Sequence, residues 1–223
     1  MTYSLVVFDW DGTLMDSTHS IVAAIQGACR DMNLPVPANE SASWVIGLSL
    51  ESALRSAVPA LTDDLVPAFL ARYRIHYLLR DPELKLFDGA GELLASLAGM
   101  GVMLAVATGK SRVGLDRALT ATGLASVFDA TRCADETFSK PHPAMLLELM
   151  ETLNVEPARV VMIGDTSHDM QMAANAGVDA VAVTYGAHSV AELRGCNPAG
   201  LVDSVSQLRE WLMPRLATAV QIK

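Results

Sequence analysis

The chain has 223 residues, of which 51% are apolar and 18% charged, and its formal net charge is −9. This composition excludes a disordered chain and suffices for one sizeable core with a modest insertion. The acidic charge disfavours nucleic acid or an anionic membrane as a partner, because neither attracts an acidic protein. Cys29, Cys133 and Cys196 form no CxxC pair, so neither disulfides nor a cysteine zinc site are expected.

The first predicted element is a strand over residues 5–8, whose continuous apolar run is typical of a strand buried on both faces. The run ends at Asp9 and follows no basic segment, so it does not resemble a signal peptide. No later apolar run approaches the roughly 18 residues of a membrane span. We therefore expect a cytoplasmic protein.

Residues 16–84 favour helices, over residues 21–32, 51–58 and 65–79, and contain no run typical of a buried strand. We predict a core of residues 1–15 and 85–223 and an inserted helical lobe of residues 16–84. Turns at Asp81-Pro82 and Asp88-Gly89 would close the insertion. The alternative is that these helices pack directly on the sheet.

Helices and strands alternate through the rest of the chain. Helices are predicted over residues 91–97 and 145–153, and strands over residues 103–107, 128–133, 160–163 and 180–183. This alternation predicts an α/β fold with a Rossmann-like parallel sheet and helices on both of its faces. Asp9, Thr108 and Asp165 each follow a predicted strand. Ligands of such sheets bind at the carboxyl ends of the strands, so we expect a site there.

Asp9 and Asp11 are the candidate catalytic pair. They lie two residues apart, so their side chains project to one side if the backbone stays extended. One aspartate can attack phosphorus, and a second can protonate the leaving oxygen and later deprotonate water. Asp9 ends the strand and is the better nucleophile, whereas Asp11 lies in the turn beyond it. A plain Asp-Gly turn is the alternative.

Asp165 is the candidate metal ligand, because together with Asp9 it would make an oxygen site suited to Mg²⁺. Asp169 follows four residues later. It could support this site, or it could only cap the next helix, where the helix dipole favours a carboxylate.

Two loops could bind a phosphoryl group. Thr108 offers its hydroxyl, and Gly109 and Lys110 offer backbone amides at a helix N-terminus. Lys140, which precedes Pro141, could neutralise the phosphoryl oxygens.

Several other motifs are excluded. A P-loop would need glycine at Leu104, a dinucleotide fingerprint would need it at Leu94, and a calcium loop fails at Thr13. The sequence contains neither HExxH nor GxSxG, which disfavours zinc and serine hydrolysis.

Four segments, in order, resemble the motifs of the haloacid dehalogenase-like superfamily, and specifically its phosphoglycolate phosphatase-like branch. They read FDWDGTLMDS (8–17), VATGK (106–110), SKPHP (139–143) and IGDTSHDM (163–170). The resemblance covers nearly the whole chain and implies a Rossmann-like core with an α-helical cap inserted after the first strand.

The resemblance implies that Asp9 is the nucleophile and Asp11 the general acid and base. It also implies that Mg²⁺ is held by the Asp9 carboxylate, the Asp11 backbone carbonyl and Asp165. The presence of Asp11 favours phosphate chemistry over dehalogenation, because dehalogenating members of the superfamily lack it.

The same resemblance implies that Thr108 and Lys140 bind the phosphoryl group and that Asp169 supports the metal site. Gly109 replaces a frequent asparagine. The role of Lys110 stays open.

The expected activity is therefore Mg²⁺-dependent hydrolysis of a small phosphorylated metabolite, similar to phosphoglycolate. A phosphosugar mutase and a non-enzymatic phospho-accepting module remain alternatives. Cations of the helical lobe could bind an anionic substrate tail, although solvent-exposed roles are favoured for each; they are Arg55, Arg72, Arg74, His76 and Arg80.

Overall fold

The computed structural model describes residues 2–80 and 84–216, and a six-stranded parallel sheet lies at its centre. The strands are β1 (Leu5–Phe8), β2 (Met103–Thr108), β3 (Ala130–Cys133), β4 (Val160–Gly164), β5 (Asp179–Val183) and β6 (Gly200–Val202). Their order is β3-β2-β1-β4-β5-β6, so β2 and β4 flank β1. The predicted α/β fold with a Rossmann-like parallel sheet is confirmed.

Each face of the sheet has its own apolar core, because successive strand residues point to opposite faces. Val6 and Phe8 face a cluster that includes helices α5 (Ala90–Gly99), α6 (Arg112–Thr122) and α10 (Val205–Leu212). Leu5 and Val7 face a cluster that includes α7 (Ala144–Leu153), α8 (Ser167–Ala176) and α9 (Val190–Gly195). Helices therefore cover both faces, which explains why β1 is apolar throughout.

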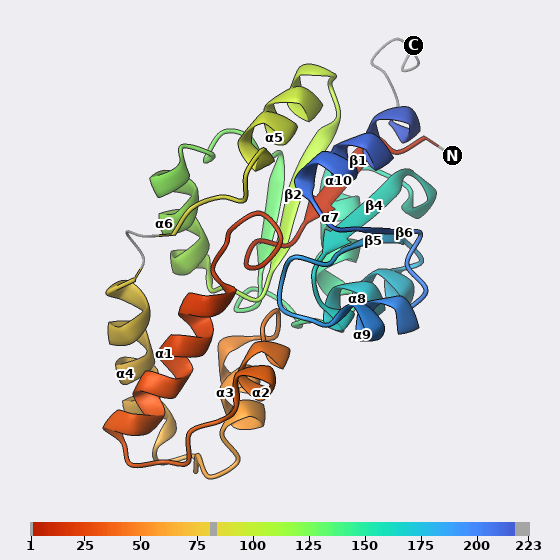
Figure 1. Ribbon diagram of the computed structural model, residues 1–223. Helices are drawn as coiled ribbons and strands as arrows, with labels where there is room; N and C mark the ends of the chain where they lie inside the picture. The colour runs from red at the N-terminus through yellow and green to blue at the C-terminus, as the bar shows by residue number, and fades with distance from the viewer. Residues whose placement is uncertain (1, 81–83, 217–223) are drawn as a thin grey trace.

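Four further helices lie together to one side of the sheet (Figure 1). They are α1 (Thr18–Asp31), α2 (Asn39–Trp44), α3 (Leu50–Ala57) and α4 (Val66–Leu78). They bury a third apolar cluster, in which Ile25 and Phe69 are almost fully enclosed. An isolated antiparallel bridge between Met15 and Leu86 joins the segment that leads into these helices to the segment that leads out of them.

The predicted elements match the described structure closely, with some omissions. The helices expected over residues 21–32, 51–58 and 65–79 correspond to α1, α3 and α4. The sequence analysis gave no residue range for α2, α6, α8, α9, α10 or β6, and the shortest of these depend on packing more than on local pattern. The expected turn at Asp81-Pro82 lies outside the described residues. Across residues 2–80 and 84–216, every helix is too short or too polar to cross a membrane.

Candidate active site

The sheet brings together three of the sequence-predicted site residues at the carboxyl ends of its central strands. Asp9 follows β1, Thr108 ends β2 and Asp165 follows β4. The Asp9 amide donates to the carbonyl of Ile163 at 2.9 Å, which continues the β1–β4 pairing as far as Asp9. All three side chains are buried. They lie side by side because β2, β1 and β4 are adjacent parallel strands whose carboxyl ends share one edge of the sheet.

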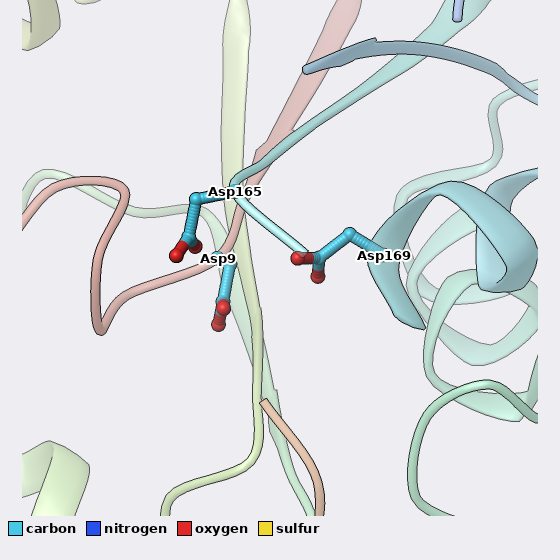
Figure 2. Close-up of side chains that lie close together, drawn as sticks. All are labelled: Asp9, Asp165 and Asp169. Atoms are coloured by element: carbon cyan, nitrogen blue, oxygen red, sulfur yellow. The ribbon is translucent and has the colours of Figure 1, made fainter. Parts of the chain in front are cut away.

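Asp9, Asp165 and Asp169 form a buried carboxylate cluster. Asp169 projects from helix α8 toward the two strand ends (Figure 2), and one oxygen from each residue lies within 4.8 Å of the others. Burial raises the pKa of Asp9 well above its usual range. Burial and the nearby charge of Asp169 raise the pKa of Asp165 to about 7. Such proximity is unfavourable for three anions and favours a bound cation.

Lys140 supplies one cation to this cluster. Its Nζ lies 2.8 Å from Asp9 Oδ1 and 2.7 Å from Asp169 Oδ1, and its side chain is 0% exposed. Burial alone would lower the pKa of Lys140, but Asp169 and Asp9 outweigh it and the pKa is raised. Lys140 therefore stays charged, and one positive charge faces three carboxyl groups.

Asp169 caps helix α8, as one of its two predicted roles required, and it also pairs with Lys140. Its Oδ2 accepts hydrogen bonds from the Thr166 amide (3.1 Å) and the Thr166 hydroxyl (2.7 Å), while its own amide donates to Thr166 Oγ1. This reciprocal arrangement caps α8. The other oxygen, Oδ1, pairs with Lys140. The helix cap thus also orients a carboxylate of the cluster.

Asp165 is held by its neighbours on both oxygens. Thr13 Oγ1 donates to Oδ1 at 2.8 Å, and the Ala187 amide donates to Oδ2 at 2.7 Å. Gly12 has φ +81°, and a Cβ there would lie 2.2 Å from Asp165 Oδ2. Glycine is needed at position 12 both for this backbone conformation and for the close approach of Asp165.

The cluster fits a hard divalent cation. All of its donors are carboxylate oxygens, which Mg²⁺ and Ca²⁺ prefer. Asp9 Oδ2 is buried and has no hydrogen-bond partner in the described part of the chain, and the ion pair with Lys140 uses the other oxygen. Burial of a carboxylate oxygen without a partner costs free energy, and a cation bound to this oxygen would offset that cost.

Asp11 lies beside this cluster but has different partners. Its Oδ1 accepts a hydrogen bond from Ser17 Oγ at 2.6 Å and lies 3.0 Å from Lys110 Nζ. Lys110 Nζ also donates to the hydroxyl of Tyr77, in helix α4, at 2.9 Å. The sequence left the role of Lys110 open and carried no signal for Tyr77, because this contact joins residues far apart in the chain.

Gly109 contacts the backbone between α2 and α3. A Cβ at this position would lie 2.4 Å from the carbonyl oxygen of Leu48 and 2.7 Å from that of Gly47. The absence of a side chain, noted in the sequence as a departure from asparagine, therefore lets residues 47–48 rest against the loop that follows β2.

A cavity of about 830 Å³ reaches the carboxylates of Asp9 and Asp11, and its walls include residues of α1, α3, α4 and α6. Asp9, Asp11, Thr108 and Gly109 line it. Lys140, Asp165 and Asp169 are not among its lining residues and are almost fully buried. The site therefore has an accessible part, where a substrate could bind, and an enclosed part that neutralises and holds Asp9.

Comparisons with known proteins show the family to which the chain is similar. The sequence model of the family described as haloacid dehalogenase-like hydrolase matches residues 6–183. A probable phosphatase, IndB, from Dickeya dadantii is 39% identical over 210 residues, which are 92% of this chain and 91% of that protein. A phosphoglycolate phosphatase from Colwellia psychrerythraea is 30% identical over 216 residues, which are 92% and 94% of the two chains.

Solved structures share the fold. A crystal structure described as a "predicted phosphoglycolate phosphatase" from Haemophilus somnus superposes with a TM-score of 0.84 at 26% identity. The match covers 95% of this chain and 98% of the other.

Proposed function

The chain belongs to the haloacid dehalogenase-like hydrolase family, and from this we propose that it is a Mg²⁺-dependent phosphatase acting on a small phosphomonoester through an aspartyl phosphate. The observation that carries the proposal is the buried carboxylate of Asp9. It lines the cavity and pairs with Lys140, and its Oδ2 has no hydrogen-bond partner among the described residues. The names of the relatives support phosphatase activity and make phosphoglycolate the reference substrate.

Asp9 and Asp11 would divide the chemistry. In the first step a carboxylate oxygen of Asp9 bonds to phosphorus as the ester oxygen leaves, and Asp11 gives that oxygen its proton. In the second step Asp11 takes a proton from water, which attacks the aspartyl phosphate and releases inorganic phosphate. Ser17 and Lys110 hold Asp11 toward the cavity for both proton transfers.

The phosphoryl group would lie against Thr108 and the amide of Gly109, and Lys140 would act on its charge through Asp9. Thr108 and Gly109 line the cavity with Asp9, and Lys140 balances the charge of Asp9 from behind. Asp9, Asp165 and the Asp11 backbone carbonyl would hold Mg²⁺, which when bound would neutralise the phosphoryl oxygens. Asp169 would support that site through Lys140 and Thr166.

The experiment is phosphate release from p-nitrophenyl phosphate and phosphoglycolate, with and without Mg²⁺. We expect turnover with Mg²⁺ and loss of nearly all of it after chelation, restored by added Mg²⁺. Undiminished activity in excess chelator would contradict the proposal. A phosphosugar mutase would instead isomerise sugar phosphates without releasing phosphate, which a parallel incubation with a hexose phosphate would detect.

We also propose that residues 16–84 act as a cap that excludes water from the site. The contacts of Gly109 with residues 47–48 and of Lys110 with Tyr77 support this proposal, because both join the helical lobe to the loop after β2.

Gly109→Ala tests the contact between Gly109 and the backbone at residues 47–48. The added methyl group would displace the backbone at residues 47–48, and a displacement of about 1 Å can cost up to 10²-fold in rate. We expect kcat/KM to fall on the order of tenfold, measured with p-nitrophenyl phosphate. Gly91→Ala is the matched control, since a Cβ there has no neighbour within 4 Å. Equal activity of the two variants would contradict the proposed cap contact.

A further inference from the structure

The cavity is large for a two-carbon leaving group. Its volume of about 830 Å³ lies within the range typical of sites for drug-sized ligands, roughly 300–1,000 Å³. It is continuous with Asp9, Asp11 and Thr108, where the phosphoryl group would bind. The remaining space is therefore available to the part of the substrate that leaves.

The walls of this space are mostly apolar. Ile21 and Ile25 of α1, Leu78 of α4 and Val113 of α6 line it. Leu78 and Val113 are 46% and 76% exposed, so they lie where the cavity meets solvent. Tyr73 also lines it and stacks on Tyr77, with ring centroids 6.0 Å apart. Apolar walls gain free energy from covering an apolar group and little from a polar one.

The cavity offers little to an anionic tail. Of the lobe cations considered from the sequence, Arg74 lines the cavity, and its side chain is exposed. Arg55 instead pairs with Glu51 and Asp63, and His76 pairs with Asp31.

The other cations of the lining are no better placed. Lys110 is engaged by Asp11 and Tyr77. Arg74 and Arg117 also line the cavity, but Glu51 and Asp135 line it as well and add negative charge to the same walls. Among the residues that line the cavity, the least exposed cation is Lys110, which already contacts Asp11 and Tyr77 and is therefore poorly placed to bind the carboxylate of glycolate.

We infer that the preferred substrate is the phosphomonoester of an apolar alcohol larger than glycolate, such as a medium-chain alkyl or an aryl alcohol. This inference rests on the proposed phosphatase function and narrows its substrate class. The phosphoryl group binds at Asp9 and Thr108, and the apolar leaving group extends along α4 and α6 toward Leu78 and Val113.

The test is kcat/KM for a series of n-alkyl phosphates from ethyl to hexyl, with phosphoglycolate and p-nitrophenyl phosphate alongside. The alkoxide leaving groups are nearly equal in reactivity, so the series isolates binding in the cavity. We expect kcat/KM to rise about three- to fourfold per methylene, giving on the order of 10² between ethyl and hexyl phosphate. Hexyl phosphate should also exceed phosphoglycolate.

Paired variants locate the effect. Leu78→Ser with Val113→Ser should reduce the hexyl-to-ethyl ratio of kcat/KM about tenfold. Leu147→Ser with Val190→Ser is the control, because these two side chains are 47% and 41% exposed but do not line the cavity. The control should keep the wild-type ratio.

The outcomes separate the two proposals. A flat alkyl series, or phosphoglycolate as the best substrate, would overturn the inference while leaving the phosphatase proposal intact. An equal loss of the ratio in both double variants would overturn the assignment of the cavity. Phosphate release from none of the esters, p-nitrophenyl phosphate included, would overturn the proposed function and this inference with it.

Discussion

Replacing Asp9 with asparagine is expected to abolish phosphate release, with kcat reduced on the order of 10⁴-fold or more. The amide is too weak a nucleophile to bond to phosphorus, so the aspartyl phosphate cannot form. The fold should persist, because asparagine has nearly the same shape and removes one of three crowded carboxyl groups. Steady-state phosphate release and thermal unfolding of the same preparation measure both effects.

Asp16→Asn is the matched control for this substitution. Asp16 belongs to the same sequence motif but is exposed to solvent, so we expect its variant to retain wild-type turnover. Asp9→Asn with more than a few per cent of wild-type activity would rule out Asp9 as the nucleophile. A variant that fails to fold would show in the unfolding curve and would contradict the expectation of a preserved structure.

Lys140→Met is expected to reduce both stability and activity. It removes a fully buried cation that lies within 2.8 Å of two carboxylates, Asp9 and Asp169. Loss of one partner of a buried ion pair costs about 3 kcal/mol or more, because the remaining charge has no compensation. We expect the free energy of unfolding, measured in urea without metal, to fall by about this amount. Phosphate release should fall on the order of 10²- to 10³-fold.

Two further variants test whether the effect of Lys140→Met comes from the loss of its charge within the carboxylate cluster. Lys85→Met removes an exposed lysine, and its unfolding free energy should stay within about 0.5 kcal/mol of wild type. Lys140→Met combined with Asp169→Asn restores the charge balance, so stability should recover in part while activity stays low. Equal stability of the Lys140 and Lys85 variants would show that Lys140 does not neutralise the cluster.

The sequence contains only four lysines and is strongly acidic, yet Lys110 and Lys140 both pair with aspartates of the site. Lys140 could be placed in the site from its motif, but its enclosure between Asp9 and Asp169 depends on helix α8 packing against the loop that carries it. From the sequence, Asp169 could either cap the following helix or support the predicted metal site. In the structure, one of its oxygens accepts the hydrogen bonds of the helix cap and the other pairs with Lys140.

The sequence itself determined the central strands and the edge of the sheet at which the site residues lie. The apolar run of β1 can only be buried on both faces, and in a parallel sheet the residues after β1, β2 and β4 necessarily share one edge. Local patterns and this one rule of topology were therefore enough to predict that Asp9, Thr108 and Asp165 lie together.

What only the tertiary structure decided depends on contacts between segments distant in the chain. Tyr77 contacts Lys110, the backbone at residues 47–48 lies against Gly109, and residues of α1, α4 and α6 line one cavity together. None of these follows from residue spacing, because each depends on how the helices of the lobe lie against the sheet. The short strand β6 was missed for the same reason: three residues carry too little pattern, and pairing with β5 supplies the strand's stability.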